Sequence, residues 1–205
     1  MKFRRILIGA AAAVVIASGV IAGPANAAPP TKQVDVALDT SAGRDLALNF
    51  FNEQTRTFDY SAAINAGSDQ AFARDFAEGV VLAGGTAQGI VVALTADQAR
   101  AAATFQRDVR GCAGRDRFWQ DKWGMHLEID TCKVNRIIAL WTAGSLGVAG
   151  LAGILGATGV AAPVALLAVI ASAMLGLGAA AVSYCNAAGR GETLHVTGVP
   201  WCGGQ

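Results

Sequence analysis

A stretch of about 50 residues, Ile137 to Gly189, carries no charged side chain and no histidine, and it constrains the fold more than any other feature. A helix of about 20 apolar residues crosses the ~30 Å core of a bilayer, so the stretch is long enough for two such helices. Glycines and a proline interrupt it at 156–163. Breakers at these positions predict a turn between two helices, Val134–Leu155 and Pro163–Cys185. We therefore expect a hydrophobic helical hairpin.

Residues 1–27 have the three parts of a secretory signal peptide. Met1–Arg5 is basic, Ile6–Ile21 is apolar, and Ala25-Asn26-Ala27 is a small-residue cleavage site. We expect cleavage after Ala27, which would place the mature protein outside the cell or in the cell envelope. An uncleaved N-terminal anchor is the alternative.

The charge of the mature chain argues against two classes of function. Three of the 16 basic side chains leave with the signal peptide, so 13 remain against 15 acidic ones. Binding of nucleic acid needs clustered Lys and Arg, and no such partner is expected. A cationic helix attracted to anionic lipid needs a Lys- and Arg-rich polar face, which this chain also lacks.

The chain contains four cysteines, all of them after residue 110. An even number in an exported protein predicts two disulfides. We favour the pairs Cys112–Cys132 and Cys185–Cys202, because each closes a loop of under about 25 residues and fixes a strand to a helix end. The alternative pairs Cys132 with Cys185 and Cys112 with Cys202. No cysteine or histidine pair has the spacing of a zinc site, and neither a metal nor a cofactor is expected.

Composition divides the mature chain into two parts. Residues 28–110 form an acidic region in which the apolar pattern predicts three short helices: Ser41–Gln54, Asp69–Gly84 and Thr95–Val109, the last beginning with a capping box. Residues 111–205 hold the cysteines, the tryptophans and the hairpin. The acidic region is interpreted either as a propeptide cut at this boundary or as a permanent part of the protein.

Two segments that flank the hairpin alternate between apolar and polar residues. Met125–Asp130 and Thr193–Thr197 have the period of half-buried strands. The ends of an antiparallel hairpin lie together, so these strands should pair. We expect a mainly α fold: short amphipathic helices, then a strand–helix–helix–strand unit with a two-stranded sheet at the base of the hairpin and two disulfides.

Small residues recur at four-residue steps in the second predicted helix: Ala168, Ser172, Gly176 and Ala180. Such a stripe allows another helix to approach closely within a membrane. It predicts helix packing in the hairpin and self-association through it. The alternative is a buried helix in the core of a soluble protein.

The two histidines are the strongest candidates for catalysis. His126 and His195 should face each other across the predicted strand pair, near carboxylates that could support acid–base chemistry. These carboxylates are Glu128, Asp130 and Glu192. No nucleophile accompanies them, since Ser145 lies in Ala-x-Ser-x-Gly and lacks the first glycine of a nucleophile elbow. We therefore expect no enzyme activity.

Three segments together resemble a loose group of small secreted proteins of Gram-positive bacteria that are bacteriocin-like or uncharacterised. They are the run Trp123 to Cys132, the tripeptide Gly189-Arg190-Gly191, and Pro200 to Gln205, around a Gly- and Ala-rich apolar hairpin. The hairpin is also similar in texture to circular and pore-forming bacteriocins. That resemblance implies action on target membranes, although this chain departs from them in having no cationic face.

These observations predict a secreted, membrane-active protein of antimicrobial or toxin type, with a lipid membrane as its partner. In this hypothesis the acidic region 28–110 keeps the hairpin soluble until it meets a membrane. The alternative is a cell-envelope protein whose hairpin is permanently inserted.

Overall fold

A computed structural model of the chain describes residues 47–104, 112–144 and 146–205. The chain divides into two units, Met1–Gln33 and Val34–Gln205, and all the described residues belong to the second. The predicted signal peptide, the predicted cleavage site at Arg110-Gly111 and Ser145 lie outside the described residues.

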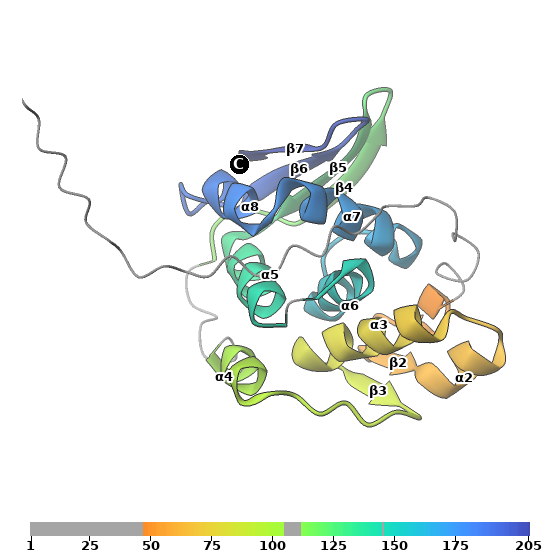
Figure 1. Cartoon of the computed structure of the whole chain (residues 1–205). Helices are drawn as coiled ribbons and strands as arrows, with labels where there is room; N and C mark the ends of the chain where they lie inside the picture. The colour runs from red at the N-terminus through yellow and green to blue at the C-terminus, as the bar shows by residue number, and fades with distance from the viewer. Residues whose placement is uncertain (1–46, 105–111, 145) are drawn as a thin grey trace, which may run out of the picture. The chain divides into compact units, whose positions relative to one another are not determined.

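The described part of the acidic region contains three helices and a small sheet (Figure 1). The helices are α2 (Tyr60–Asn65), α3 (Gln70–Leu82) and α4 (Ala96–Thr104), and the strands are β1 (Phe51–Asn52), β2 (Thr57–Asp59) and β3 (Thr86–Gln88). Strand β2 pairs antiparallel with β1 and parallel with β3. The prediction of α3 is confirmed, and α4 lies within the third predicted helix. The first predicted helix is wrong at its end, where residues 51–52 form β1.

Side-chain caps explain where these helices begin. Asp59 Oδ1 accepts a hydrogen bond from the Ala62 amide at 2.9 Å, and Asp69 Oδ1 accepts one from the Phe72 amide at 2.7 Å. Before α4, the Thr95 amide donates to Gln98 Oε1 at 2.7 Å, and the Gln98 amide donates to Thr95 Oγ1 at 3.2 Å. This reciprocal pair is the predicted capping box, and it satisfies amides that the helix itself cannot pair.

The second part of the chain has two strands on each side of a run of helices. Strands β4 (Arg117–Asp121) and β5 (Gly124–Ile129) precede helices α5 (Thr131–Gly144), α6 (Val148–Thr158), α7 (Leu167–Leu177) and α8 (Ala179–Cys185). A 3-10 turn, η1 (Val164–Leu166), leads into α7, and strands β6 (Glu192–Val196) and β7 (Trp201–Gly204) follow α8. The four strands form one antiparallel sheet in the order β4-β5-β6-β7.

The prediction of a mainly α fold is wrong, because two sheets make up a substantial part of the structure. The described residues form seven α-helices, one sheet of three strands and one of four. The predicted pairing of the two flanking strands is correct, with His126 opposite His195. They are the central strands of a larger sheet, since β4 and β7 add one strand at each edge.

The predicted hairpin of two long helices is also wrong. Helices α5 and α6 separate near residues 145–147, and α7 and α8 separate at Gly178, whose φ of +82° ends α7. The segments Val164–Leu177 and Ala179–Cys185 meet at a bend of 94°. Within the described residues no single helix is long and apolar enough to cross a membrane, although this bent pair reaches the required length and composition when taken together.

Helix α6 is the centre of the hydrophobic core. Ten of its eleven residues are buried, and the helix packs against α3, α5 and α7 (Figure 1). Glycines bring α3 and α6 together: a Cβ at Gly79 would overlap the carbonyl oxygen of Gly150, and a Cβ at Gly153 would overlap that of Phe76. The acidic region and the cysteine-containing region therefore share one core.

The close crossing of α3 and α6 gives a stability test. We expect Gly79→Ala and Gly153→Ala each to lower the free energy of unfolding by about 1–3 kcal/mol, because the added methyl group must displace backbone. Gly198→Ala is the control, since its Cβ would meet nothing within 4 Å. Urea unfolding of the oxidised protein measures the difference. Equal urea midpoints for all three variants would contradict the close crossing of α3 and α6.

Candidate functional site

An exposed protein surface without charge extends along α7, α8 and the turns beside them. Residues 159–189 include no charged side chain. Their exposed members are Gly159, Ala161, Pro163, Ala165, Val169, Gly176, Ala180, Ser183, Tyr184, Ala187, Ala188 and Gly189. We call these residues the uncharged face. A surface suited to water mixes charged residues among the others, and these twelve include none, although Lys133 and Glu53 from other segments lie beside Gly159.

Helix α7 presents two different sides. Ile170, Ala171 and Met174 are buried in the core, where α7 packs against α6, whereas Val169 is 43% exposed. The outward side of α7 therefore carries apolar or small residues. No other described element covers it. The N-terminus of α7 follows Pro163 and the 3-10 turn, which positions the helix over α6.

The two turns at one end of the four-stranded sheet add exposed aromatic and aliphatic side chains. Trp123 is 71% exposed in the β4–β5 turn, Val199 is 79% exposed in the β6–β7 turn, and Trp201 is 52% exposed at the start of β7. Met125 lies opposite Val196, so both turns lie at the same end of the sheet. We call Trp123, Val199 and Trp201 the sheet tip. The sheet tip adjoins α7, because a Cβ at Gly176 would lie 3.9 Å from Pro200 Cγ.

One disulfide joins a helix to the sheet, and the other joins a helix to the segment before β4. Cys185 at the end of α8 bonds to Cys202 in β7, and Cys112 bonds to Cys132 in α5. This is the pairing favoured from loop length. The bonds indicate an oxidising environment, outside the cell or in its envelope. Asp130 lies close to Cys112 and Cys132, but the joined sulfurs offer no thiolate, so this group does not form a metal site.

The predicted stripe of small residues is divided between two helices. Ala168, Ser172 and Gly176 lie on α7, whereas Ala180 lies on α8 beyond the bend. Ser172 Oγ donates to the Ala168 carbonyl at 2.8 Å, and Gly176 and Ala180 are exposed. Their role in packing within a membrane stays a prediction.

The outer face of the four-stranded sheet carries a row of four rings, one from each strand. Trp119 stacks on His126 with centroids 4.9 Å apart, and Trp201 stacks on His195 with centroids 3.6 Å apart. The two imidazoles meet in the middle, where His126 Nδ1 and His195 Nδ1 are 2.7 Å apart. His126 Nε2 lies 3.1 Å from Asp121 Oδ1.

One assignment of protons satisfies this chain of contacts. His126 donates from Nε2 to Asp121 and accepts at Nδ1 from the Nδ1–H of His195, which leaves His195 Nε2 with a free lone pair. Burial and the neighbouring His126 lower the pKa of His195, against the opposing effect of Asp121. The Trp123 amide and His126 donate hydrogen bonds that lower the pKa of Asp121. His195 is therefore mainly neutral at neutral pH.

None of the three carboxylates predicted to accompany the histidines has a hydrogen bond or ion pair with a histidine in the described structure. Glu128 shares the outer face but accepts two hydrogen bonds from Arg115, at 2.6 and 2.9 Å, which lower its pKa. Asp130 caps α5 by accepting from the Lys133 amide at 2.9 Å. Glu192 lies on the inner face with Leu194. The carboxylate that does contact a histidine, Asp121, was missed because it is the last residue of β4, a strand that the sequence pattern did not predict.

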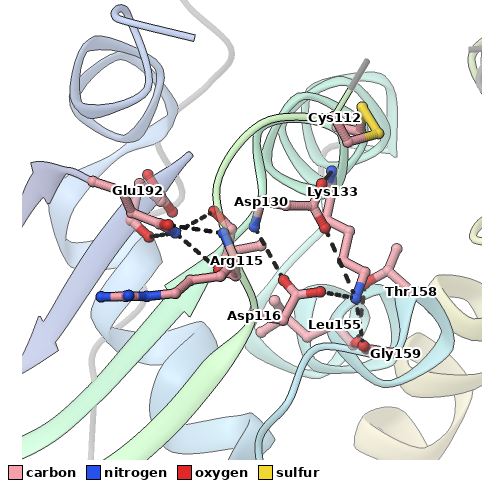
Figure 2. A network of polar contacts seen from close by, with 12 residues as sticks. Cys112, Arg115, Asp116, Asp130, Lys133, Leu155, Thr158, Gly159 and Glu192 are labelled. Carbon is pink, nitrogen blue, oxygen red and sulfur yellow. Dashed lines mark hydrogen bonds and ion pairs between the residues drawn. A yellow bond between two sulfur atoms is a disulfide. The ribbon is translucent and has the colours of Figure 1, made fainter. Parts of the chain in front are cut away.

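A polar network fixes the ends of β4, β5 and β6 to the helices (Figure 2). Lys133 Nζ donates to Asp116 and, at 2.9 Å, to the carbonyl of Gly159 at the end of α6. The Gln205 side-chain amide donates to three carbonyls, those of Arg115, Ile129 and Glu192, at 2.9–3.1 Å. These contacts hold the sheet against α5 and α6.

The Glu192 carboxyl group is fully buried inside this arrangement. Neither of its oxygens has a hydrogen-bond partner among the described residues, and burial raises its pKa from 4.5 to about 8. A buried carboxyl without a partner is far more stable protonated than ionised. At neutral pH this side chain is therefore mainly a neutral acid inside the core.

Glu192 makes the stability of the fold dependent on pH. The folded state holds a proton that the unfolded state has already released above pH 4.5, so stability should fall between about pH 4.5 and 8, by an amount on the order of 4 kcal/mol. The Glu192→Gln variant should not show this fall, and at pH 8.5 its urea midpoint should be higher than that of the parent. Glu128→Gln, which breaks the pair with Arg115, should instead destabilise at neutral pH. Urea midpoints from pH 4 to 9 measure both, and a parent curve without a decline would contradict the assignment.

Comparison with known proteins identifies no relative. No protein family, curated protein or solved structure matches this chain. The resemblance to secreted bacteriocin-like proteins therefore stays a prediction, and the site has to be interpreted from its own geometry.

Proposed function

We propose that this chain is a secreted, membrane-active protein of bacteriocin or toxin type, which meets a lipid membrane through its uncharged face. One observation carries the proposal: residues 159–189 expose two helices and their turns to solvent without a single charge. A surface that only had to remain in water would be expected to carry charged side chains. Contact with lipid favours their absence, because a charged side chain is costly to bring into a bilayer.

The sheet tip supports the same orientation. Tryptophan is enriched where a membrane meets water, and Trp123 and Trp201 are both exposed at the end of the sheet where Pro200 adjoins α7. Lys122 Nζ lies 5.0 Å from the centroid of the Trp123 ring. A lysine next to a tryptophan at the membrane surface can extend its ammonium group to the lipid headgroups. Contact in this proposal depends on apolar and aromatic side chains rather than on positive charge.

Because helix α6 is buried, the acidic region has a second role in this proposal. Helix α3 comes from that region and covers α6 through the contact at Gly79 and Gly150. In the proposed function α3 keeps α6 from lipid until the protein has bound. A cut near Arg110 would leave α3 in place, because its packing against α6 does not depend on the peptide bond that is cut.

The alternative of a permanently inserted envelope protein is less well supported. It requires the apolar helices to face lipid, whereas in this fold α6 is covered by α3, α5 and α7. Extraction of the producer's membranes at alkaline pH separates the two. A chain that stays entirely in the membrane and never reaches the medium would favour the alternative.

Two valine variants test the uncharged face. Val169→Asp adds a charge to α7, and Val91→Asp adds the same charge after β3, where Val91 is 92% exposed. We expect Val169→Asp to weaken binding to lipid vesicles at least tenfold, since charge opposes contact with apolar lipid, and Val91→Asp to leave it unchanged. Cosedimentation of the oxidised protein with vesicles of neutral and anionic lipid measures both, and dye leakage reports membrane damage.

The outcome is decided by the contrast between the variants. Equal binding by both would remove the uncharged face from the mechanism. No binding or leakage by the parent protein in either kind of vesicle would remove the membrane function itself. Circular dichroism of each variant confirms that the fold is intact before binding is compared.

A further inference from the structure

We propose that His126 and His195 form a binding site for one Cu²⁺ ion on the outer face of the four-stranded sheet, with both Nδ1 atoms as ligands. The two nitrogens already lie 2.7 Å apart on the neighbouring central strands. Imidazole is a good ligand for copper, nickel and zinc. The site is separate from the uncharged face and does not depend on the proposed membrane function.

The surrounding rings hold both ligands in place. Trp119 stacks on the His126 ring with an interplanar angle of 17°, and Trp201 stacks on the His195 ring with one of 10°. The imidazole planes are nearly perpendicular to each other, at 79°. Because the tryptophans restrict both rings before any ion arrives, little side-chain freedom remains to be lost on binding.

Asp121 supplies the usual support of a metal-bound histidine. A histidine that binds a metal through one nitrogen typically donates its other N–H to a carboxylate, which fixes the tautomer and the orientation of the ring. His126 Nε2 lies 3.1 Å from Asp121 Oδ1, so Nδ1 is the nitrogen left with a lone pair. Asp121 is therefore a positioning residue in this proposal.

The order of affinities of divalent ions for nitrogen ligands selects the ion. At metal–nitrogen distances near 2.05 Å, the two nitrogens are about 2.9 Å apart for ligands at 90° and about 3.3 Å apart for a tetrahedral angle. The observed 2.7 Å is a hydrogen bond between the rings, so binding has to move the nitrogens apart, and ligands at 90° require the smaller movement. Tetragonal Cu²⁺ uses 90° angles, and it also binds nitrogen ligands more tightly than zinc does. When the ion binds, the His195 proton moves from Nδ1 to Nε2, and rotation of the half-buried His195 ring directs both Nδ1 lone pairs at the ion, with water in the remaining positions.

The rest of the chain offers few competing ligands. The protein contains two histidines and four cysteines, and the cysteines are all joined in disulfides. Glu128, the other carboxylate on this face beside His126, is held by Arg115. Copper bound through imidazole nitrogen can therefore be assigned to this site without mapping, provided that the protein carries no histidine tag.

The first experiment uses the unmodified, tag-free, oxidised protein. Titration with CuCl₂ should quench tryptophan fluorescence and saturate at one ion per chain, because Trp119 and Trp201 contact the ligating rings. Electron paramagnetic resonance of the 1:1 sample should show a tetragonal spectrum with hyperfine splitting from two imidazole nitrogens. Zn²⁺ should bind more weakly and displace copper only in large excess.

Three variants complete the test. His195→Gln should abolish saturable binding, and Asp121→Asn should weaken it about tenfold, as loss of a supporting carboxylate commonly does. The control is Asp97→Asn, which removes a carboxylate of the same charge from α4, outside the sheet, and should leave copper binding unchanged. Unsaturable quenching, a spectrum without two imidazole nitrogens, or equal affinity of Asp121→Asn and Asp97→Asn would overturn the proposal. The spectrum of the unmodified protein decides the matter even if a variant fails to fold.

Discussion

The crossing of α3 over α6 is the contact on which the rest of the structure depends. Helix α6 carries no charge and exposes almost nothing, so it needs partners on every side. Helix α3 supplies one of these sides at a distance that only glycine permits, with Gly79 against Gly150 and Gly153 against Phe76. Without this crossing α6 would be open to water or lipid on one side, and the two parts of the chain would have no common core.

Close helix crossings through small residues are familiar from membranes, where they replace the missing hydrophobic effect. Here the same device lies inside a folded core next to aromatic packing. Phe76 on α3 also packs edge-on against Phe51 and Phe58, with centroids 5.6 and 5.0 Å apart. Phe76 and Gly79 are three residues apart and therefore neighbours on the surface of α3, so one helix contacts both the small sheet and α6.

The sheet organises a second, polar half of the molecule. Its inner face holds Leu127, Ile129 and Leu194 in the core, and its outer face holds the row of rings around the two histidines. The alternation of a β-strand separates the two sets. Glu192 is the exception, because its position in that alternation points a carboxyl group inward, and its raised pKa is the result.

Local patterns in the sequence predicted a good part of this structure. The alternation at Met125–Asp130 and Thr193–Thr197 predicted β5, β6 and their pairing, and loop length favoured the two disulfides. Strands β4 and β7 were missed: polar and exposed residues occupy most of β4, and glycines end β7. Position in the sheet, rather than local propensity, makes these segments strands.

The errors in the helices have a different cause. Composition alone favoured long apolar helices, but it could not weigh the interruptions at residues 145–147 and at Gly178, where a positive φ turns the chain by 94°. The partners of α6 and the ring contacts of His126 depend on residues distant in sequence. Asp121 reaches His126 because β4 pairs with β5 and places Asp121 on the same face as His126, as its diagonal neighbour.

The bond between Cys185 and Cys202 has a consequence for the timing of folding. It is the covalent link between α8 and β7, and the second bond fixes the segment before β4 to α5. Thiols remain reduced in most cytosolic compartments, so both links would form only after export. A producing cell would then hold the chain with its helices and sheet still unlinked. Oxidation outside would complete the molecule, and in this way the cell that makes the protein would never contain its finished form.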